Sequence, residues 1–197
     1  HSTAEAHDRV MVVELMGRYA GWIALNAGVS ATADAILIPE IPFDIDAVCR
    51  KVRSRELQGR RFSIVVVAEG AKPAGGDMLF RGDKQAGRER RLGGMGEIVA
   101  AEIEERTKKE TRTVVLGHLQ RGGTPSSFDR LIALRFGAAA IRAIETGNTN
   151  VMVALDPPTV RYVPLASAIE RTKTVPLDCD TVLTAREMGI CLGDNVW

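Results

Sequence analysis

One stretch decides the fold, because in it an apolar strand runs directly into polar residues and glycines: Val114-Val115-Leu116-Gly117-His118-Leu119-Gln120-Arg121-Gly122-Gly123-Thr124-Pro125. In a parallel α/β sheet, ligands bind beyond the carboxyl ends of the strands, where helix N-termini expose free N–H groups. A planar guanidinium beside flexible glycines suits a phosphate group. The stretch therefore predicts an anion-binding strand end in an α/β protein.

The rest of the chain alternates strands with helices. Strands are expected at Val10–Leu15, Ala35–Pro39, Phe62–Ala68, Thr113–Leu116 and Val151–Leu155. Helices are expected at Tyr19–Ala27, Asp44–Leu57, Glu97–Lys109, Ser127–Glu145 and Pro164–Arg171, with Asp44 as an N-cap. Because the strands are apolar along most of their length, the pattern predicts a three-layer α/β/α sandwich with a mainly parallel sheet.

Two stretches depart from this alternation. Residues Lys72–Gly94 are rich in glycine and in charged side chains, which favours an exposed, solvated loop. The alternative is that the basic part of this loop, Arg81–Arg91, binds an effector. The tail after Val175 becomes apolar again around Val182–Leu183 and Ile190–Leu192. We expect the tail to pack back on the body of the protein.

Composition excludes several classes of protein. The 197 residues are 45% hydrophobic and 26% charged, which is typical of a globular protein. The net charge of +1 gives no overall positive electrostatic field that would attract nucleic acid. The three cysteines form no CxxC pair, and no apolar run is long enough to span a membrane. We expect a cytoplasmic protein without a membrane partner. Because the chain begins with His1 rather than Met, we also expect processing or truncation at its start.

Polar residues follow each predicted strand: Met16-Gly17-Arg18, Glu40, Glu69-Gly70, His118-Gln120-Arg121 and Asp156. Parallel strands share a direction, so these groups should converge on one crevice. Arginines and a histidine there suit a phosphate group, and carboxylates suit sugar hydroxyls. The sequence thus predicts a site for a phosphorylated, hydroxyl-rich ligand.

Simpler interpretations remain open at this point. The glycines could be plain turn residues, and His118 could be a structural histidine. Arg9 and Arg112 read as solvated surface charges. The sequence contains no GxGxxG after a strand, no GxxxxGK[ST] loop and no HExxH, so dinucleotide binding, P-loop hydrolysis and zinc-peptidase chemistry lose their main support.

Three blocks carry a resemblance to a known family: RVMVVELMGRYAG (9–21), VVAEG (66–70) and ETRTVVLGHLQRGGTPSSFDR (110–130). They resemble the carboxyl-terminal half of 6-phosphofructokinases, over nearly the whole chain. The resemblance implies two α/β domains, with residues 1–119 and 172–197 in the fructose 6-phosphate domain and 120–171 in the nucleotide domain. It implies phosphoryl transfer to the 1-hydroxyl of fructose 6-phosphate, giving fructose 1,6-bisphosphate in glycolysis.

The resemblance also assigns roles to individual residues. Contact with fructose 6-phosphate is implied for Met16, Gly17, Arg18, Glu69, His118 and Arg121. A contribution to a neighbouring subunit's site is implied for Arg9 and Arg112, and hence a homo-oligomer, dimer or tetramer, with shared sites. Arg18 is in addition a candidate for stabilising charge in the transition state. Glu14 lies within the first block but receives no role.

One departure from the family pattern bears on catalysis. The glycine-rich donor loop and the TIDND-like segment, which carries the catalytic aspartate and helps hold Mg²⁺, lie upstream of this sequence in the family. We therefore expect the general base and the metal ligands outside these residues, and a chain that is inactive alone. The donor could be ATP or pyrophosphate. The alternative from another class is a non-catalytic regulatory subunit that binds a sugar phosphate.

Overall fold

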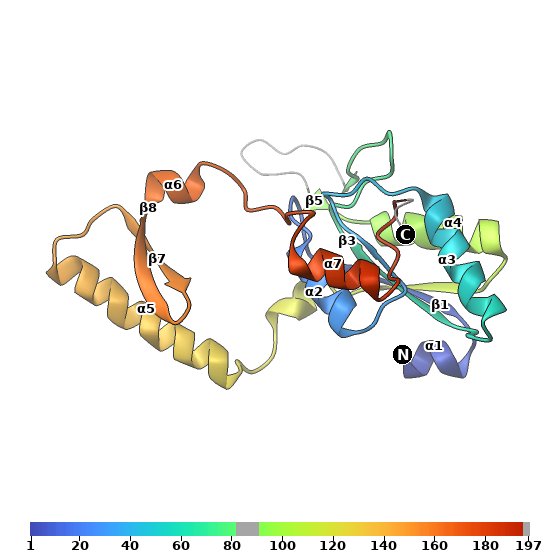
Figure 1. The fold of residues 1–197 in the computed structure, drawn as a ribbon, viewed down its shortest axis with the longest axis horizontal. Helices are drawn as coiled ribbons and strands as arrows, with labels where there is room; N and C mark the ends of the chain where they lie inside the picture. Colours follow the sequence, from blue (N-terminus) through green and yellow to red (C-terminus); the bar gives the residue numbers. More distant parts are fainter. Residues whose placement is uncertain (82–90, 195–197) are drawn as a thin grey trace. The chain divides into compact units, whose positions relative to one another are not determined.

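The computed structural model describes residues 1–81 and 91–194, which fall into two compact units (Figure 1). The first unit comprises residues 1–120 and the tail from Thr174, and the second comprises Arg121–Lys173. The first unit contains α1 (Ser2–Ala6), β1 (Val10–Leu15), α2 (Trp22–Ser30), β2 (Ala35–Leu37), α3 (Ile45–Leu57), β3 (Ser63–Ala68), β4 (Phe80–Arg81), β5 (Arg91–Leu92), α4 (Met95–Thr107), β6 (Thr111–Val115) and α7 (Asp180–Glu187). Lys84, Arg88 and Arg90 of the predicted basic loop lie outside the described residues.

The centre of the first unit is a four-stranded parallel sheet in the order β2-β3-β1-β6. Val10 at the start of β1 lies opposite Ser63 of β3 and Thr111 of β6, so the three strands begin at the same level. All six residues of β3 are buried, as expected for a strand covered on both faces. The prediction of a mainly parallel sheet is confirmed.

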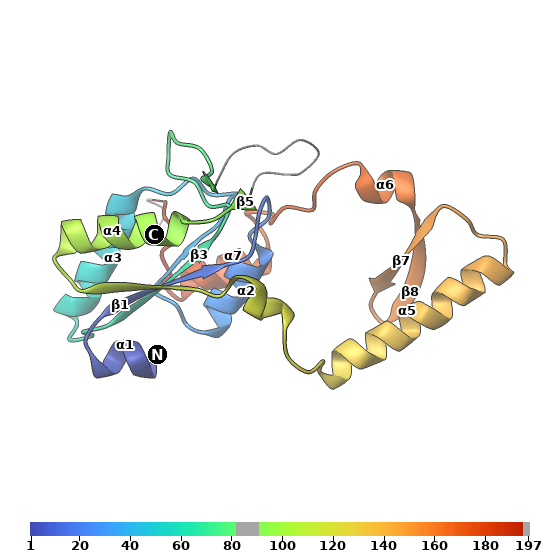
Figure 2. The same ribbon diagram turned by 180° about the vertical axis from the view of Figure 1, so that it is seen from behind.

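Helices cover both faces of this sheet (Figures 1 and 2). On one face, Val10 and Val12 share a buried core with residues of α3 and α4. On the other face, Leu15 lies in a second core with residues of α2 and α7. The tail thus packs on the body as expected, because Val182 of α7 is fully buried in that second core. The three-layer prediction is confirmed.

Two helix starts have identifiable causes. Asp44 caps α3 as predicted, since its Oδ1 accepts a hydrogen bond of 2.9 Å from the N–H of Asp46. Helix α4 begins at Met95, earlier than the predicted Glu97. It does so because Gly94 adopts a left-handed conformation, with φ of 94°, that lets the chain turn directly into the helix.

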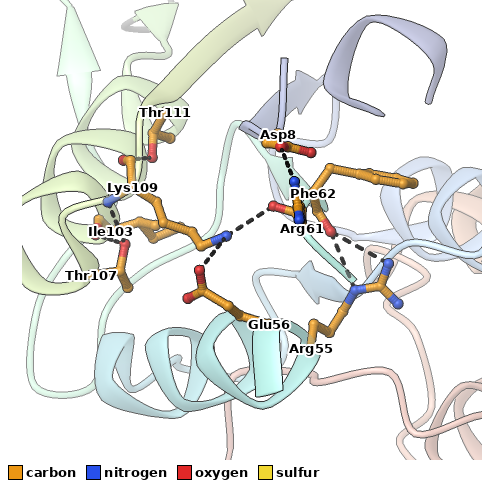
Figure 3. Close-up of polar contacts among 9 residues, drawn as sticks. All are labelled: Asp8, Arg55, Glu56, Arg61, Phe62, Ile103, Thr107, Lys109 and Thr111. Atoms are coloured by element: carbon orange, nitrogen blue, oxygen red, sulfur yellow. Dashed lines mark hydrogen bonds and ion pairs between the residues drawn. The ribbon is translucent and has the colours of Figure 1, made fainter. Parts of the chain in front are cut away.

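Polar contacts hold the amino-terminal ends of the strands in place (Figure 3). Lys109, just before β6, donates to the carbonyl oxygen of Arg61 at 2.8 Å and pairs with Glu56 of α3 at 3.3 Å. Arg61 in turn lies 3.4 Å from Asp8, just before β1. These contacts link the segments that precede β1, β3 and β6.

The second unit consists of α5 (Ser127–Glu145), β7 (Val151–Asp156), β8 (Thr159–Pro164) and α6 (Leu165–Ile169). Helix α5 begins with a capping box between Ser126 and Asp129, and the hydroxyl of Tyr162 on β8 donates to the carbonyl oxygen of Ala139 on α5 at 2.9 Å. No helix in the described parts of the chain is long and apolar enough to cross a membrane.

The strand predicted at Val151–Leu155 exists, but its expected place in the parallel sheet is wrong. β7 pairs antiparallel with β8, a strand that was not predicted, because only Pro157 and Pro158 separate the two. A connection that short permits only an antiparallel return. Asp156 is therefore not at the end of a strand of the parallel sheet, and its carboxylate lies 3.6 Å from Arg161 in the hairpin.

Candidate functional site

A pocket of about 680 Å³ lies at the carboxyl ends of β1, β3 and β6. Four of the predicted site residues line it: Met16, Arg18, Glu69 and His118. Its volume is within the range of small-molecule sites in proteins. The expected convergence of strand ends therefore holds for these three strands.

A hydrogen bond joins the end of β1 to the turn that follows β6. The backbone N–H of Met16 donates to Oε1 of Gln120 at 2.7 Å, between residues 104 positions apart in the chain. Gln120 lies in the 3₁₀ turn η1 (Gly117–Arg121), which carries His118. Gln120 was placed at the strand end from sequence, but its anchoring role was not predicted.

The loop after β3 is held equally close to the loop after β1. The N–H of Glu69 donates to Leu15 O at 2.8 Å, and Oε1 of Glu69 accepts a longer bond of 3.4 Å from Gly17. A Cβ atom on Gly70 would lie 1.8 Å from the carbonyl oxygen of Arg18, so only glycine fits there. Gly17 thus contributes its N–H to orienting Glu69.

Glu40 follows β2 at the same edge of the sheet but does not line the pocket. Its carboxylate accepts hydrogen bonds from the N–H groups of Gly21, at 3.0 and 3.1 Å, and Val175, at 2.8 Å. Glu40 therefore holds the start of α2 and the returning tail in place. Its role is structural, and it does not contact the pocket.

The two residues predicted as phosphate ligands occupy the same turn. His118 is exposed and lines the pocket. Arg121 is also exposed, but it is the last residue of η1 and the first of the second unit, and it is not in the lining. The contact of Arg121 with a phosphate stays a prediction.

Arg9 and Arg112 lie at the opposite end of the strands from the pocket. Arg9 directly precedes β1, and Arg112 pairs with Met11 near the start of that strand. Neither arginine is in the lining of the pocket.

One carboxylate, which the sequence had not singled out, holds both of these arginines. Oε2 of Glu110 lies 2.8 Å from Nε of Arg9, and Oε1 lies 2.6 Å from Nη2 of Arg112. The hydrogen bond from Arg9, followed by its charge and then that of Arg112, lowers the pKa of Glu110.

Six residues of the pocket lining were not among the predicted ligand contacts, and three of them are Glu14, Leu92 and Gly93. Leu92 and Gly93 belong to the charged, glycine-rich segment expected as an exposed loop, yet both are buried. Within residues 1–81 and 91–194, no group of three or more His, Cys, Asp or Glu side chains is placed to hold a metal ion.

Fold and pocket together define the class of α/β proteins with a parallel sheet and a pocket at the carboxyl ends of its strands. The family follows from comparison. A family model described as Phosphofructokinase matches residues 1–144, and the chain belongs to that family.

Relatives with curated names are similar over most of the chain. The ATP-dependent 6-phosphofructokinase of Chloroflexus aurantiacus is 52% identical over 196 residues, which is 100% of this chain and 53% of that protein. The ATP-dependent 6-phosphofructokinase of Mycobacterium tuberculosis is 51% identical over 178 residues, covering 89% of this chain and 52% of that protein. The chain thus spans about half the length of the curated relatives it matches.

Solved structures confirm the fold. The phosphofructokinase of Saccharomyces cerevisiae superimposes with a TM-score of 0.72 and 29% identity, over 86% of this chain and 21% of that one. The pyrophosphate-dependent phosphofructokinase of Marinobacter aquaeolei gives a TM-score of 0.74 over 98% of this chain and 50% of that one. Its identity is only 21%, so this likeness concerns the fold alone.

Proposed function

We propose that this chain supplies the fructose 6-phosphate-binding part of an ATP-dependent 6-phosphofructokinase. One observation carries the proposal: Arg18, Glu69 and His118, from three distant segments of a phosphofructokinase-family chain, line one pocket. Cationic and hydrogen-bonding donors together with a carboxylate match a sugar that carries both a phosphate and free hydroxyls.

Each group has a part in holding the sugar. Arg18 and His118 donate to phosphate or hydroxyl oxygens, and Arg121 joins them on the phosphate. Glu69, oriented by the N–H of Gly17, accepts from a sugar hydroxyl. Charge-assisted hydrogen bonds contribute about 1.5–3 kcal/mol each, so two or three account for an affinity between about micromolar and millimolar.

In the reaction, the oxygen of the 1-hydroxyl forms a bond to the terminal phosphorus of the donor and gives its proton to the general base. The bond from that phosphorus to the bridging oxygen breaks, and ADP leaves, or phosphate when the donor is pyrophosphate. Such transfer depends mainly on positioning and on neutralising charge. The residues of this chain orient the acceptor, and the guanidinium of Arg18 stabilises negative charge that develops near the transferred group. Mg²⁺, when bound, supplies further charge neutralisation at the donor phosphates. We assign the general base to no residue of this chain.

ATP is the donor we favour. The curated relatives that are 49–52% identical are named ATP-dependent, whereas two pyrophosphate-dependent enzymes of known structure are 21% and 25% identical. Pyrophosphate is the second candidate. A coupled assay with each donor in turn distinguishes them: turnover with pyrophosphate and none with ATP would reverse the preference.

The position of Arg9 and Arg112 supports a homo-oligomer with shared sites. Neither arginine lines the pocket of its own chain, and Glu110 pairs with both guanidinium groups. In a symmetric assembly the pair reaches the phosphate in the pocket of a neighbouring subunit.

Isothermal titration calorimetry tests the proposal on the native protein that carries this sequence. Fructose 6-phosphate should bind in the micromolar-to-millimolar range, and unphosphorylated fructose should bind at least about tenfold more weakly. Failure of fructose 6-phosphate to bind refutes the proposal. Binding without turnover with either donor would instead establish the regulatory-subunit alternative. Turnover by the 197-residue chain alone would show that the general base is among these residues after all.

A further inference from the structure

Glu14 is a buried carboxylate near the end of β1 that the reaction described above does not use. Its side chain is 3% exposed and lies on the face of the sheet that α4 covers. Oε2 of Glu14 accepts hydrogen bonds from the N–H groups of Gly96, at 2.7 Å, and Gly94, at 3.2 Å. Oε1 accepts a further, longer bond of 3.3 Å from Gly94.

These donors are the free N–H groups of the first turn of α4. A helix N-terminus carries a partial positive charge and binds phosphate readily when nothing else fills it. The N-cap of α4 is Gly94, which has no side chain to fill that position, so the carboxylate comes from β1 instead. A Cβ atom on Gly96 would lie 3.0 Å from both Cβ and Oε2 of Glu14, so glycine there permits the close approach.

The same carboxylate lines the candidate site. Glu14 and Gly93, directly before α4, lie in the wall of the pocket that also contains Arg18 and His118. Without Glu14, the pocket would offer a phosphate group two places to bind: the cationic side chains and the open N-terminus of α4. With Glu14 present, the second place is occupied by a group of the same sign as phosphate.

We propose that Glu14 is a specificity-determining residue, which closes the N-terminus of α4 to anions and so allows the sugar phosphate to bind in one orientation only. The phosphate of the sugar then lies toward His118. This inference rests on the proposed function for the identity of the sugar, but the exclusion of anions is a property of the pocket itself.

The variant Glu14→Gln tests this in the native protein. The amide oxygen of Gln keeps the short bond from Gly96, while the negative charge is removed. Inorganic phosphate, titrated directly by calorimetry, should bind about tenfold more tightly than to the wild type, and should inhibit by competition with fructose 6-phosphate. The matched control is Glu97→Gln, because Glu97 is exposed in the first turn of the same helix and does not line the pocket. Phosphate affinity should not change in the control.

Other outcomes separate the inference from its alternatives. A purely structural Glu14 predicts a lower melting temperature and a higher KM with unchanged phosphate affinity, and that result overturns the proposal. If fructose 6-phosphate does not bind the wild type, the proposed function fails, but the phosphate titrations still decide the role of Glu14. If Glu14→Gln does not fold, crystals of the wild type soaked in phosphate decide it. Phosphate near His118 supports the proposal, and phosphate bound to the N–H groups of Gly94 and Gly96 refutes it.

Discussion

Replacing Gln120 with methionine should weaken sugar binding, because it removes the acceptor that joins the end of β1 to the turn carrying His118. The bond from Met16 N–H to Gln120 Oε1 is 2.7 Å long and half-buried. Leaving a buried donor unpaired costs about 1–3 kcal/mol, and partial access of water to Met16 places the cost at about 1–2 kcal/mol. If that energy is lost from the bound state, the KM for fructose 6-phosphate rises by about 5–30-fold.

Steady-state kinetics and thermal unfolding of the native protein check this prediction. The Gln120→Met variant should show the higher KM with a kcat changed less than KM, since the bond positions the sugar pocket rather than the donor. The control is Gln58→Met, the same substitution at an exposed residue that is not in the pocket lining. A KM that stays at the wild-type value would refute the view that Gln120 positions His118 relative to Met16.

Three further results are expected. Gly70→Ala should destabilise the protein by about 2–4 kcal/mol in chemical denaturation, because the added Cβ would overlap the carbonyl oxygen of Arg18. The control Gly137→Ala should be neutral or stabilising, because there is open space around the added Cβ. Equal stabilities of the two variants would contradict the packing described. The lowered pKa of Glu110 means that its ion pairs stabilise the fold above the ordinary value of 4.5 and are lost as the pH falls through the lowered pKa. The melting temperature of Glu110→Gln should therefore lie below that of the wild type at pH 7 and converge with it as the pH falls through the lowered pKa, and a constant gap would refute this. Mixing subunits that carry Arg18→Ala with subunits that carry Arg112→Ala should restore part of the activity lost in each, and absence of rescue would argue against shared sites.

The sequence predicts the sheet and half of the site well, for a simple physical reason. Parallel strands share a direction, so β-branched runs that each end in a polar residue bring those residues to one edge. Met16, Glu69 and His118 follow β1, β3 and β6 in this way, and all three line the pocket. The proximity of these three residues could therefore be predicted without knowing the conformation of the loops.

The features that were missed depend on contacts between distant residues. Glu14 reads as an anomaly in an apolar strand, and only the position of α4 shows that it accepts bonds from residues 80 and 82 positions away. Leu92 and Gly93 sit in a segment whose charge suggests solvent, although their neighbours in space bury them. The β7–β8 hairpin was missed because strand periodicity does not reveal the direction in which the next strand returns.

A crystal structure of the native protein with fructose 6-phosphate tests the central claim most directly. The proposed function predicts the sugar in the pocket of about 680 Å³, with a hydroxyl within hydrogen-bond distance of Glu69 and its phosphate on the side of His118. Sugar bound elsewhere, with this pocket empty, would contradict the claim that these strand ends form the acceptor site.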